Sequence, residues 1–368
     1  MGIIISLISF MILICVLVAV HEFGHFFAAR MNGVHVEAFS IGYGPILFKK
    51  TDRKGTEWRF SLIPVGGYVK MFGDADATSV REKIPLGYSE EDLNKMSLHR
   101  KKPWQKLIVA FAGPFMNFVF AIFILIGLSS IKGLPVYNNT INVPSENSLA
   151  YTSGLRSGDK ITKINDKEIT NFEQIRDNIT SNIGKDISME ISRNNQKIDN
   201  IQIKLYNERN EPISTIGISP SGFEYEKISF LRSISTSCLM TWNIARENIK
   251  SIFQIFTAKQ SVKNVGGVIS IFKVSADSME AGFSNYIWMM AFLSIILGAV
   301  NLLPIPVLDG GTVVISAIEW IIRRPLNQKF VETIFMIGLF IVAGLMILGI
   351  WNDLSKLKFF IWMENLFK

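Results

Sequence analysis

The stretch His21-Glu22-Phe23-Gly24-His25 is the most chemically specific part of this sequence. On a helix, residues four positions apart differ by about 40° in azimuth, so both imidazoles point to one side and can share a metal ion. Zinc accepts imidazole nitrogens at about 2.0 to 2.1 Å, and Glu22 can take a proton from a zinc-activated water. The alternative is a polar helix end where the histidines meet lipid headgroups. Ionisable groups inside a membrane are costly and usually functional, which favours the metal site.

Two histidines leave a catalytic zinc site one protein ligand short, and Asp309 is the candidate for the third. It belongs to the segment 301–311, Asn-Leu-Leu-Pro-Ile-Pro-Val-Leu-Asp-Gly-Gly. Pro304 and Pro306 break the preceding helix, and irregular backbone at membrane depth must be buried in protein or face a cavity. Asp309 is also a good N-cap for a helix at 310–322, and capping and ligation can coexist through different oxygens.

Other polar residues are weaker candidates for the metal. Glu319 has Arg323 four residues later, which offers it a local ion pair on a helix. His35 and His99 lie in polar loop sequence, where histidines are more often surface residues than ligands.

Two asparagines lie in apolar surroundings and could contact a substrate. Asn117 follows Gly113 and Pro114 near the start of an apolar block, and Asn301 opens the segment that leads to Asp309. Their amides could hold a substrate strand or an oxyanion. They could equally form hydrogen bonds between packed helices in hydrocarbon. The sequence leaves both roles open.

The elements that carry these residues are membrane spans. Hydrophobic residues make up 49% of the chain, near the ordinary globular value, but they gather in long blocks, and the mean hydropathy is +0.29. A bilayer core of roughly 30 Å takes about 20 helical residues. Four blocks are near that length: 2–20, about 107–131, 286–303 and 331–351. This pattern excludes a soluble enzyme. The first block lacks a basic n-region, and cleavage near its end would remove the paired histidines, so we expect a retained span and not a signal peptide.

The distribution of charge indicates the orientation. The net charge is +7, and basic residues gather near span ends in the first and third connections: Arg30, Lys49, Lys50, Arg53, Lys54, Arg59, Lys101, Lys102, Lys106, Arg323, Arg324 and Lys329. Basic residues close to span ends stay cytoplasmic. We therefore expect both termini and the long middle segment outside, with both candidate metal-binding motifs near the cytoplasmic leaflet. The positive charge then needs no nucleic-acid partner.

The first connection, roughly 31–103, contains a predicted β-hairpin. Residues 57–63 alternate in part, 64–67 form the predicted turn and 68–72 follow as the second strand. Their apolar character is compatible with a re-entrant or interfacial position on the cytoplasmic side of the membrane, and an ordinary cytoplasmic hairpin fits the pattern equally.

Composition divides the chain into four parts. These are an N-terminal membrane part (1–132), a polar, strand-rich extracytoplasmic domain (133–224), an amphipathic connector (225–283) and a C-terminal membrane part (284–368). Charges such as Arg232 and Arg246 interrupt the connector, which favours helices on the membrane surface over a fifth span. Cys15 would lie inside the membrane, so no disulfide with Cys238 is expected.

Together these motifs resemble the bacterial site-2 protease family of intramembrane zinc metalloproteases, particularly its RseP-like branch. The matching stretches are ordered along most of the chain: 21–25, 41–45, 63–71, 113–117, 265–269 and 301–311. The resemblance implies a Zn2+ ion bound by His21, His25 and Asp309. Glu22 would be the general base, and the predicted hairpin would lie beside the substrate. The candidate substrate-binding residues are Asn117, Asn301, Gly66, Gly67 and Tyr68.

Residues 154–159, Gly-Leu-Arg-Ser-Gly-Asp, continue into Ile161-Thr-Lys-Ile-Asn165 and look like the signature of bacterial PDZ domains. PDZ domains can bind a peptide by strand addition. The resemblance implies that this module admits substrates that another protease has already trimmed. The sequence shows one such stretch, where some members of the family carry tandem copies.

The expected fold is an α-helical membrane protein with four transmembrane helices, a membrane-associated β-hairpin region on the cytoplasmic side and one extracytoplasmic PDZ-like α/β domain. The expected function is zinc-dependent cleavage of the transmembrane segments of single-span proteins in the bacterial inner membrane. An upstream protease would act first, and the substrate would be an anti-sigma factor or a remnant signal peptide. Two rival functions remain. A catalytically silent PDZ scaffold would not need Glu22, and a zinc transporter would be expected to have histidines in its other spans.

Overall fold

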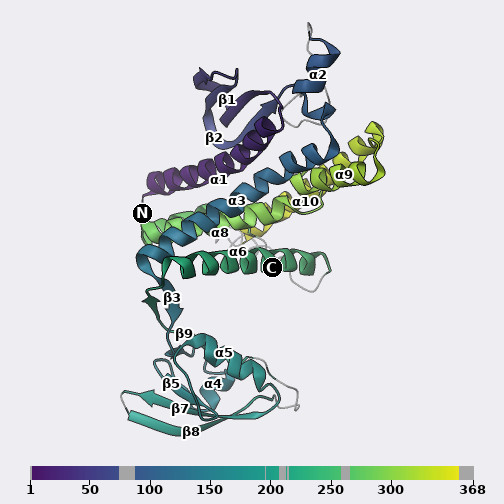
Figure 1. Cartoon of the computed structure of the whole chain (residues 1–368). Coiled ribbons are helices and arrows are strands. Elements are labelled where there is room, and N and C mark those ends of the chain that lie inside the picture. The colour runs from purple at the N-terminus through teal and green to yellow at the C-terminus, as the bar shows by residue number, and fades with distance from the viewer. Residues whose placement is uncertain are drawn as a thin grey trace, which may run out of the picture. The chain divides into compact units, whose positions relative to one another are not determined.

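The computed structural model describes residues 2–73, 88–194, 196–206, 213, 215–257 and 266–355. Val265 of one matching stretch, part of the first connection (74–87) and the end of the C-terminal membrane part (356–368) lie outside the described residues. The chain divides into two compact units, one made of Met1–Leu128 with Ser233–Lys368 and the other of Ser129–Arg232 (Figure 1). Each unit is described by itself.

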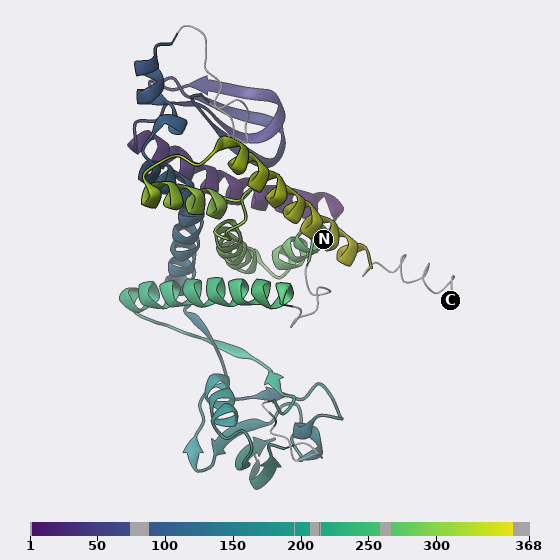
Figure 2. The same ribbon diagram turned by 90° about the vertical axis from the view of Figure 1, so that its right-hand side faces the viewer.

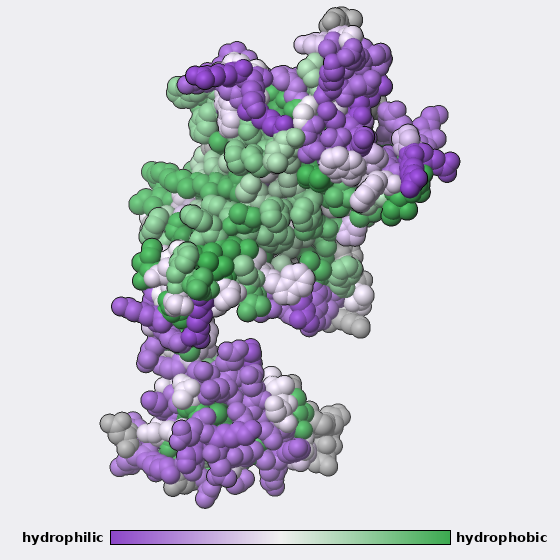
Figure 3. Space-filling view, viewed as in Figure 1, coloured by the Kyte–Doolittle hydropathy of each residue, from purple (hydrophilic) through white to green (hydrophobic). Residues whose placement is uncertain are grey.

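The first unit is built on long helices (Figure 2). Within the described residues, four helices are long and apolar enough to cross a membrane: α1 (Ile3–Met31), α3 (Pro103–Lys132), α8 (Phe283–Asn301) and α10 (Gln328–Ser355). Figure 3 shows a largely hydrophobic surface over the helices of this unit. The predicted number of candidate spans in a mostly helical membrane protein is confirmed.

Helix α1 continues through the histidine motif without a break. It has 29 residues, ends at Met31 and has Asn32 as its C-cap. At about 1.5 Å per residue this length is about 43 Å, so the apolar block 2–20 covers only part of the helix. The predicted helical position of residues 21–25 is confirmed.

The connection between α1 and α3 forms a β-sheet. Strand β1 (Val36–Thr51) pairs antiparallel with strand β2 (Glu57–Met71). Residues 38–41 of β1 have partners at both 67–70 and 57–60 of β2. Because a strand has one hydrogen-bonding edge on each side, residues 38–41 lie between those two segments of β2.

This pairing corrects the predicted hairpin. The predicted pairing of 57–63 with 68–72 is wrong, because β2 continues through 64–67 and its two halves pair with β1 and not with each other. Its two halves run in opposite directions along residues 38–41, so the chain does reverse between them. Gly66 has a φ of 106°, a conformation that glycine adopts without strain and that bends the strand at this point. The turn signals therefore mark a bend inside one strand.

The turn between β1 and β2 is attached to the end of α1. Arg30 forms an ion pair with Asp52 and donates a hydrogen bond to the buried Thr56 Oγ1 at 2.8 Å. Asp52 also accepts hydrogen bonds from Trp58 Nε1 at 3.2 Å and from Lys54 N at 2.8 Å. Burial acts to raise the pKa of Asp52, but these hydrogen bonds together hold that pKa well below its usual range. The sheet is thus fixed to the helix that carries the histidines.

The remaining helices of the first unit are shorter or less apolar: α2 (Glu90–Met96), a 3-10 turn (Leu98–Arg100), α6 (Phe230–Phe256), α7 (Val268–Glu280) and α9 (Asp309–Ile322). Helices α6 and α7 fall in the predicted amphipathic connector, and neither is among the four candidate spans. α6 buries Ser233 and Ser237 and exposes Leu239 and Trp242. Its exposed residues also include Arg246, Glu247 and Lys250, so the outer face is mixed, as expected of a helix at a membrane surface.

The second unit is a small α/β unit with its own core. Its four-stranded sheet has the order β6-β5-β7-β8, and β3 pairs with β10 and β4 with β9. Buried aliphatic side chains such as Ile161, Ile175 and Ile187 form the core. The elements are β3 (Leu134–Tyr137), β4 (Ile141–Asn142), α4 (Leu149–Thr152), β5 (Lys160–Ile164), β6 (Lys167–Glu168), α5 (Phe172–Ser181), β7 (Asp186–Arg193), β8 (Gln196–Lys204), β9 (Ser219–Pro220) and β10 (Phe223–Glu226). The assignment of this unit as a PDZ domain stays a prediction.

Candidate metal centre

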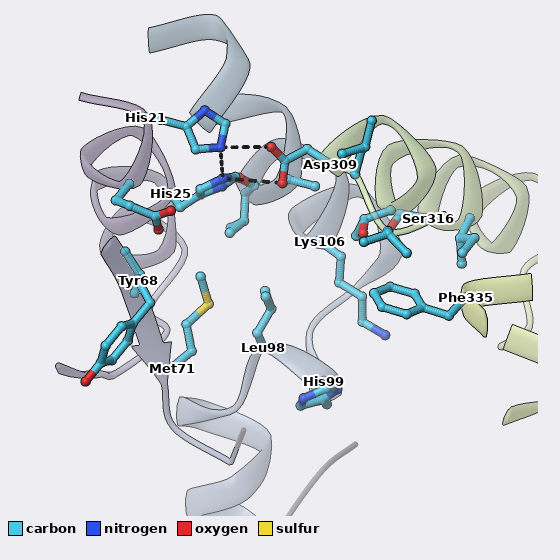
Figure 4. A pocket seen from close by; sticks show the side chains of 18 of the residues that line it. His21, His25, Tyr68, Met71, Leu98, His99, Lys106, Asp309, Ser316 and Phe335 are labelled. Atoms are coloured by element: carbon cyan, nitrogen blue, oxygen red, sulfur yellow. Dashed lines mark hydrogen bonds and ion pairs between the residues drawn. The ribbon is translucent and has the colours of Figure 1, made fainter. Parts of the chain in front are cut away.

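The three predicted metal ligands lie together where α1 meets the start of α9. His21 Nε2 is 3.0 Å from Asp309 Oδ2, and His25 Nε2 is 3.4 Å from Asp309 Oδ1. The two imidazole Nε2 atoms are 3.2 Å apart. Figure 4 shows the three side chains pointing toward one another. In the part of the chain that the structure describes, this is the one group of histidine, cysteine and carboxylate side chains close enough to share a metal ion.

The distances within this group are close to those between two ligands of one zinc ion. Two ligand atoms that each lie about 2.0 to 2.1 Å from a tetrahedral zinc are about 3.3 to 3.4 Å apart. The two imidazole Nε2 atoms are 3.2 Å apart, and each approaches a different oxygen of Asp309, His21 at 3.0 Å from Oδ2 and His25 at 3.4 Å from Oδ1. Two imidazoles with one carboxylate are also a donor set found in zinc proteases, and three protein ligands leave a fourth position open. The residues present therefore fit zinc.

Two glycines allow α1 and α3 to meet closely at this centre. A Cβ on Gly24 would lie 2.2 Å from Ala112 O, and a Cβ on Gly113 would lie 2.2 Å from His25 Nε2. Neither position can hold a larger residue without moving the opposite helix or the imidazole. The absence of a side chain at Gly113 thus leaves room for the His25 ring.

The proline segment ahead of α9 places Asp309. Helix α8 ends at Asn301 and α9 begins at Asp309, so the predicted break is present. Asp309 is the first residue of α9, and its N-cap is Leu308. The expected capping position of Asp309 is therefore wrong by one residue, and its two oxygens face the imidazoles instead. A Cβ on Gly310 would lie 2.3 Å from Leu303 O, so a glycine is needed for the helix to start against the loop.

Each imidazole also has a contact at its second ring nitrogen. His25 Nδ1 lies 2.8 Å from Val109 O, and His21 Nδ1 lies 3.1 Å from Asn117 Nδ2. Contacts of this kind fix the orientation of metal-binding histidines. Asn117 is fully buried, and neither Asn117 nor Asn301 is among the described residues that line the adjoining cavity. The structure therefore brings Asn117 to the back of His21 and leaves Asn301 at the end of α8.

A cavity of about 500 Å³ opens beside the three ligands. Of the other predicted site residues, Glu22, Gly67 and Tyr68 line it, and Gly66 is not among the described lining residues. A Cβ on Gly67 would lie 2.6 Å from Ser40 O and 3.6 Å from Glu22 Cγ. The candidate general base therefore lies between the metal centre and strand β2.

Tyr43 lines this cavity, although the sequence analysis gave it no role. Its hydroxyl donates a hydrogen bond to Gly67 O at 2.8 Å, and its ring stacks on Tyr68 with 5.9 Å between the centroids. The sequence could have indicated this role, because Tyr43 is an aromatic residue between Gly42 and Gly44 in a stretch that matches the family.

Glu319 lines the cavity. Its ion-pair partner is not the residue that helical spacing predicted. Its Oε2 lies 3.7 Å from Lys106 Nζ on α3, and its Oε1 accepts a hydrogen bond from Leu326 N at 3.1 Å. Arg323, the predicted partner, is the C-cap of α9 with a φ of 56°. The expected local ion pair is thus replaced by one between two helices. His99, which we expected at the surface, also lines the cavity but lies outside the candidate ligand group.

Comparisons with known proteins place the chain among peptidases. A family model described as Peptidase family M50 matches residues 9–345. A protein of Agrobacterium fabrum named as a zinc metalloprotease is 32% identical over 95% of this chain and 96% of its own length. Metalloprotease MmpA of Caulobacter vibrioides is 29% identical over 100% of this chain and 99% of its own length. A Clostridium perfringens protein, also named as a zinc metalloprotease, is 34% identical over 92% of this chain and 95% of its own length.

Proposed function

Because this chain belongs to peptidase family M50, the site-2 proteases, and is an intramembrane zinc metalloprotease, we propose that it cleaves the membrane-spanning segments of single-span membrane proteins. One observation carries this proposal: the candidate metal centre lies on α1, a helix apolar enough to cross a membrane. A peptide bond that reaches the centre must therefore lie within the bilayer or at its edge. The metalloprotease assignment also excludes the silent scaffold and the zinc transporter as the main function.

We propose His21, His25 and Asp309 as the zinc ligands, which the close approach of the two imidazole Nε2 atoms and the Asp309 carboxylate supports. Zinc, when bound, supplies a Lewis acid that polarises the scissile carbonyl and makes water acidic enough to ionise near neutral pH. Glu22 follows His21 on the same helix and lines the cavity. It can accept the proton of the attacking water and later pass it to the leaving amine.

Strand β2 offers a surface for an unwound substrate. A peptide bond within a helix is already hydrogen-bonded, so the substrate must unwind before hydrolysis, and its freed backbone groups then need new partners. Residues 67–71 of β2 have β1 as their only strand partner among the described residues, and Gly67, Tyr68 and Met71 line the cavity. We propose that the substrate adds as a strand at this edge, next to Glu22.

We further propose that the protein lies in the bacterial inner membrane with both termini outside and the metal centre near the cytoplasmic leaflet. The basic residues near the span ends support this orientation. The second unit would then lie outside as a PDZ-like domain that admits substrates already trimmed by an upstream protease. An anti-sigma factor and remnant signal peptides are the two substrate classes that we propose.

The proposal is tested by cleavage of a panel of single-span reporters in lipid vesicles, with the wild type, Glu22→Gln and the control Glu37→Gln. Glu37 pairs with Lys70 on β1 and β2 and is not among the described cavity residues. We expect the wild type and Glu37→Gln to cut within the reporter span. Glu22→Gln should lose about 10²- to 10⁴-fold in rate and keep its zinc. A chelator should stop cleavage and added zinc restore it.

Two results would refute parts of the proposal. Unimpaired cleavage by Glu22→Gln would exclude Glu22 as the base. Cleavage of soluble peptides with every membrane reporter left intact would exclude membrane-spanning segments as the substrate class.

A further inference from the structure

We propose that Asn117 is a positioning residue for His21: its side-chain oxygen accepts a hydrogen bond from the Nδ1–H of that imidazole and holds the ring with Nε2 toward the metal. This inference rests on the proposed role of His21 as a zinc ligand. It assigns Asn117 to one of the two roles that the sequence left open, hydrogen bonding between helices, and excludes a direct contact with the substrate or the oxyanion.

The position of Asn117 excludes direct contact with the substrate. Its exposed fraction is 0%, and the cavity beside Glu22 is lined by Val109 and Ala110 of α3 but not, among the described residues, by Asn117. A group that stabilises an oxyanion must lie within hydrogen-bond reach of the reacting carbonyl. Asn117 instead contacts the side of the His21 ring that faces away from Asp309.

The chemistry of a metal-bound imidazole determines which amide atom must face it. When Nε2 gives its lone pair to a metal, the ring proton lies on Nδ1, which then can only donate a hydrogen bond. The side-chain nitrogen of Asn117 is placed 3.1 Å from His21 Nδ1, and this pairing requires Nδ1 to be an acceptor. With zinc on Nε2, two donors would face each other.

A rotation of the Asn117 amide by 180° resolves this conflict. Its Oδ1 is buried and has no hydrogen-bond partner among the described residues. The two ends of an amide have nearly the same size, so the rotation keeps the packing and exchanges donor for acceptor. Either orientation leaves one amide group without a described partner. The orientation of the amide is therefore set by the proton on His21 Nδ1, which requires the Asn117 Oδ1 acceptor to face it.

His25 provides an internal reference for this assignment. Its Nδ1 lies 2.8 Å from Val109 O, and a carbonyl oxygen can only accept. His25 therefore carries a proton on Nδ1, and in the neutral ring the lone pair of Nε2 faces Asp309. The same state at His21 requires an acceptor at the equivalent place, and the Asn117 amide, which contacts His21 Nδ1, can supply it. The two imidazoles are thus oriented by the same helix, one through a backbone oxygen and the other through a side chain.

The backbone of Asn117 is held from the opposite side. Asn117 O accepts a hydrogen bond at 2.9 Å from Ser294 Oγ, and Ser294 is fully buried on α8. Helix α8 leads directly into the segment that places Asp309. Asn117 therefore links the helix of the histidines to the helix ahead of the carboxylate. Ser294 offers a matched control, because its removal weakens the helix contact and leaves the amide and the imidazole in place.

The test uses the full-length protein in detergent micelles with zinc, and the variants Asn117→Leu, Asn117→Ala, Asn117→Asp, Ser294→Ala and His21→Ala. Three quantities are measured: zinc affinity by competition with a chelator, thermal unfolding of the zinc-free form, and cleavage of a membrane reporter. Asn117→Leu and Asn117→Ala lack the acceptor and should lower zinc affinity about 10- to 100-fold.

Asn117→Asp keeps an acceptor but loses the amide donor. Carboxylates commonly orient zinc-bound histidines, so this variant should keep both zinc affinity and cleavage within about threefold of the wild type. Ser294→Ala should leave zinc affinity unchanged.

Several outcomes would overturn the inference. Wild-type zinc affinity in both Asn117→Leu and Asn117→Ala would do so, whether or not their zinc-free forms unfold at lower temperature. Loss of cleavage in Asn117→Asp with its zinc retained would assign the amide to the oxyanion or the substrate. If His21→Ala keeps its zinc, the ligand assignment itself is wrong. Loss of zinc in His21→Ala with retention in both acceptor-free variants would leave the proposed function intact and remove only the role of Asn117.

Discussion

Two aspartates, one in each unit, differ in burial and in how their charge is balanced. Asp159 of the second unit has a side chain that is 1% exposed, and it accepts hydrogen bonds from Arg193 Nε at 2.7 Å, Arg193 Nη2 at 2.8 Å and Arg156 N at 2.7 Å. Asp309 of the first unit is 23% exposed beside the cavity and faces two imidazoles.

The difference supports a structural role for Asp159 and the proposed ligand role for Asp309. The Asp159 carboxylate has a permanent cation within the protein, and their hydrogen bond raises the pKa of Arg193. The partners of Asp309 are imidazoles, which leave its charge unbalanced when they are neutral. Their ligand atoms are close enough to share a metal ion, and the zinc ion that we propose there would balance the charge. The chemistry of the partners therefore distinguishes the proposed ligand from the structural aspartate.

The largest expected effect is at Asp309. Asp309→Ala should lower zinc affinity more than about 100-fold, because changes to residues that merely orient a ligand already cost about 10- to 100-fold. Cleavage of a membrane reporter should disappear with the zinc, while the fold of the second unit is unchanged. The zinc content of the purified protein and the rate of reporter cleavage measure these two losses. Wild-type zinc content in Asp309→Ala would indicate that Asp309, like Asp159, has a structural role and is not a zinc ligand.

A change at Asp159 should have the opposite result, a loss of stability with no loss of zinc. Asp159→Asn leaves Arg193 without its charged partner, and the second unit should lose about 3 kcal/mol of stability. Hydrogen exchange of the β5 and β7 amides in the full-length protein measures this loss. Zinc affinity should not change. The exposed Asp166, with a φ of 65° that Asn also tolerates, gives the control Asp166→Asn, for which we expect a change within about 0.5 kcal/mol. Equal exchange rates in the two variants would contradict a structural role for Asp159.

A third prediction concerns the space around His25. Gly113→Ala puts a Cβ 2.2 Å from His25 Nε2, so the ring must move and zinc affinity should fall about tenfold. Gly127→Ala on the same helix has no atom within 4 Å of the added Cβ, and zinc affinity should stay at the wild-type value. Chelator competition compares the two variants. A tenfold loss in both would indicate a general effect on α3 and not a clash at the metal centre.

The smallest expected effect is at Asp52, whose side chain is 25% exposed and pairs with Arg30. Asp52→Asn should weaken the protection of the Gly55 and Thr56 amides from hydrogen exchange by about 1 kcal/mol. The pKa of Asp52 is lowered in the folded protein, so the wild-type contribution is present above about pH 4, near the ordinary aspartate pKa, and is lost as the pH falls further toward the lowered value. Protection factors compared between pH 6 and pH 3 test this. A wild-type loss already complete at pH 5 would contradict the lowered pKa.

The parts of the site that lie close together in sequence could be predicted. His21 and His25 share one helix face because four residues make about one turn, and this geometry needs no tertiary information. The break ahead of Asp309 follows from two prolines in an apolar helix. The approach of Asp309 to the histidines was available only from the resemblance to the protease family, since no local rule joins residues about 290 positions apart.

The predictions that were wrong depended on distant partners. Turn signals at 64–67 indicated a local hairpin, but β2 pairs with β1 on both halves, and local residues do not reveal which strand lies alongside. Glu319 was expected to pair with Arg323 by helical spacing, but Lys106 of α3 lies close enough to take that place. For Asn117 the sequence could show a polar group among apolar residues, and only the structure shows that it lies against His21.

X-ray absorption at the zinc edge of the zinc-loaded full-length protein shows which atoms bind the metal. We expect one zinc per chain with two imidazole nitrogens and oxygen ligands at about 2.0 to 2.1 Å. One imidazole should be lost in His21→Ala. A coordination shell that contains sulfur, or a shell left unchanged by both His21→Ala and Asp309→Ala, would contradict this expectation.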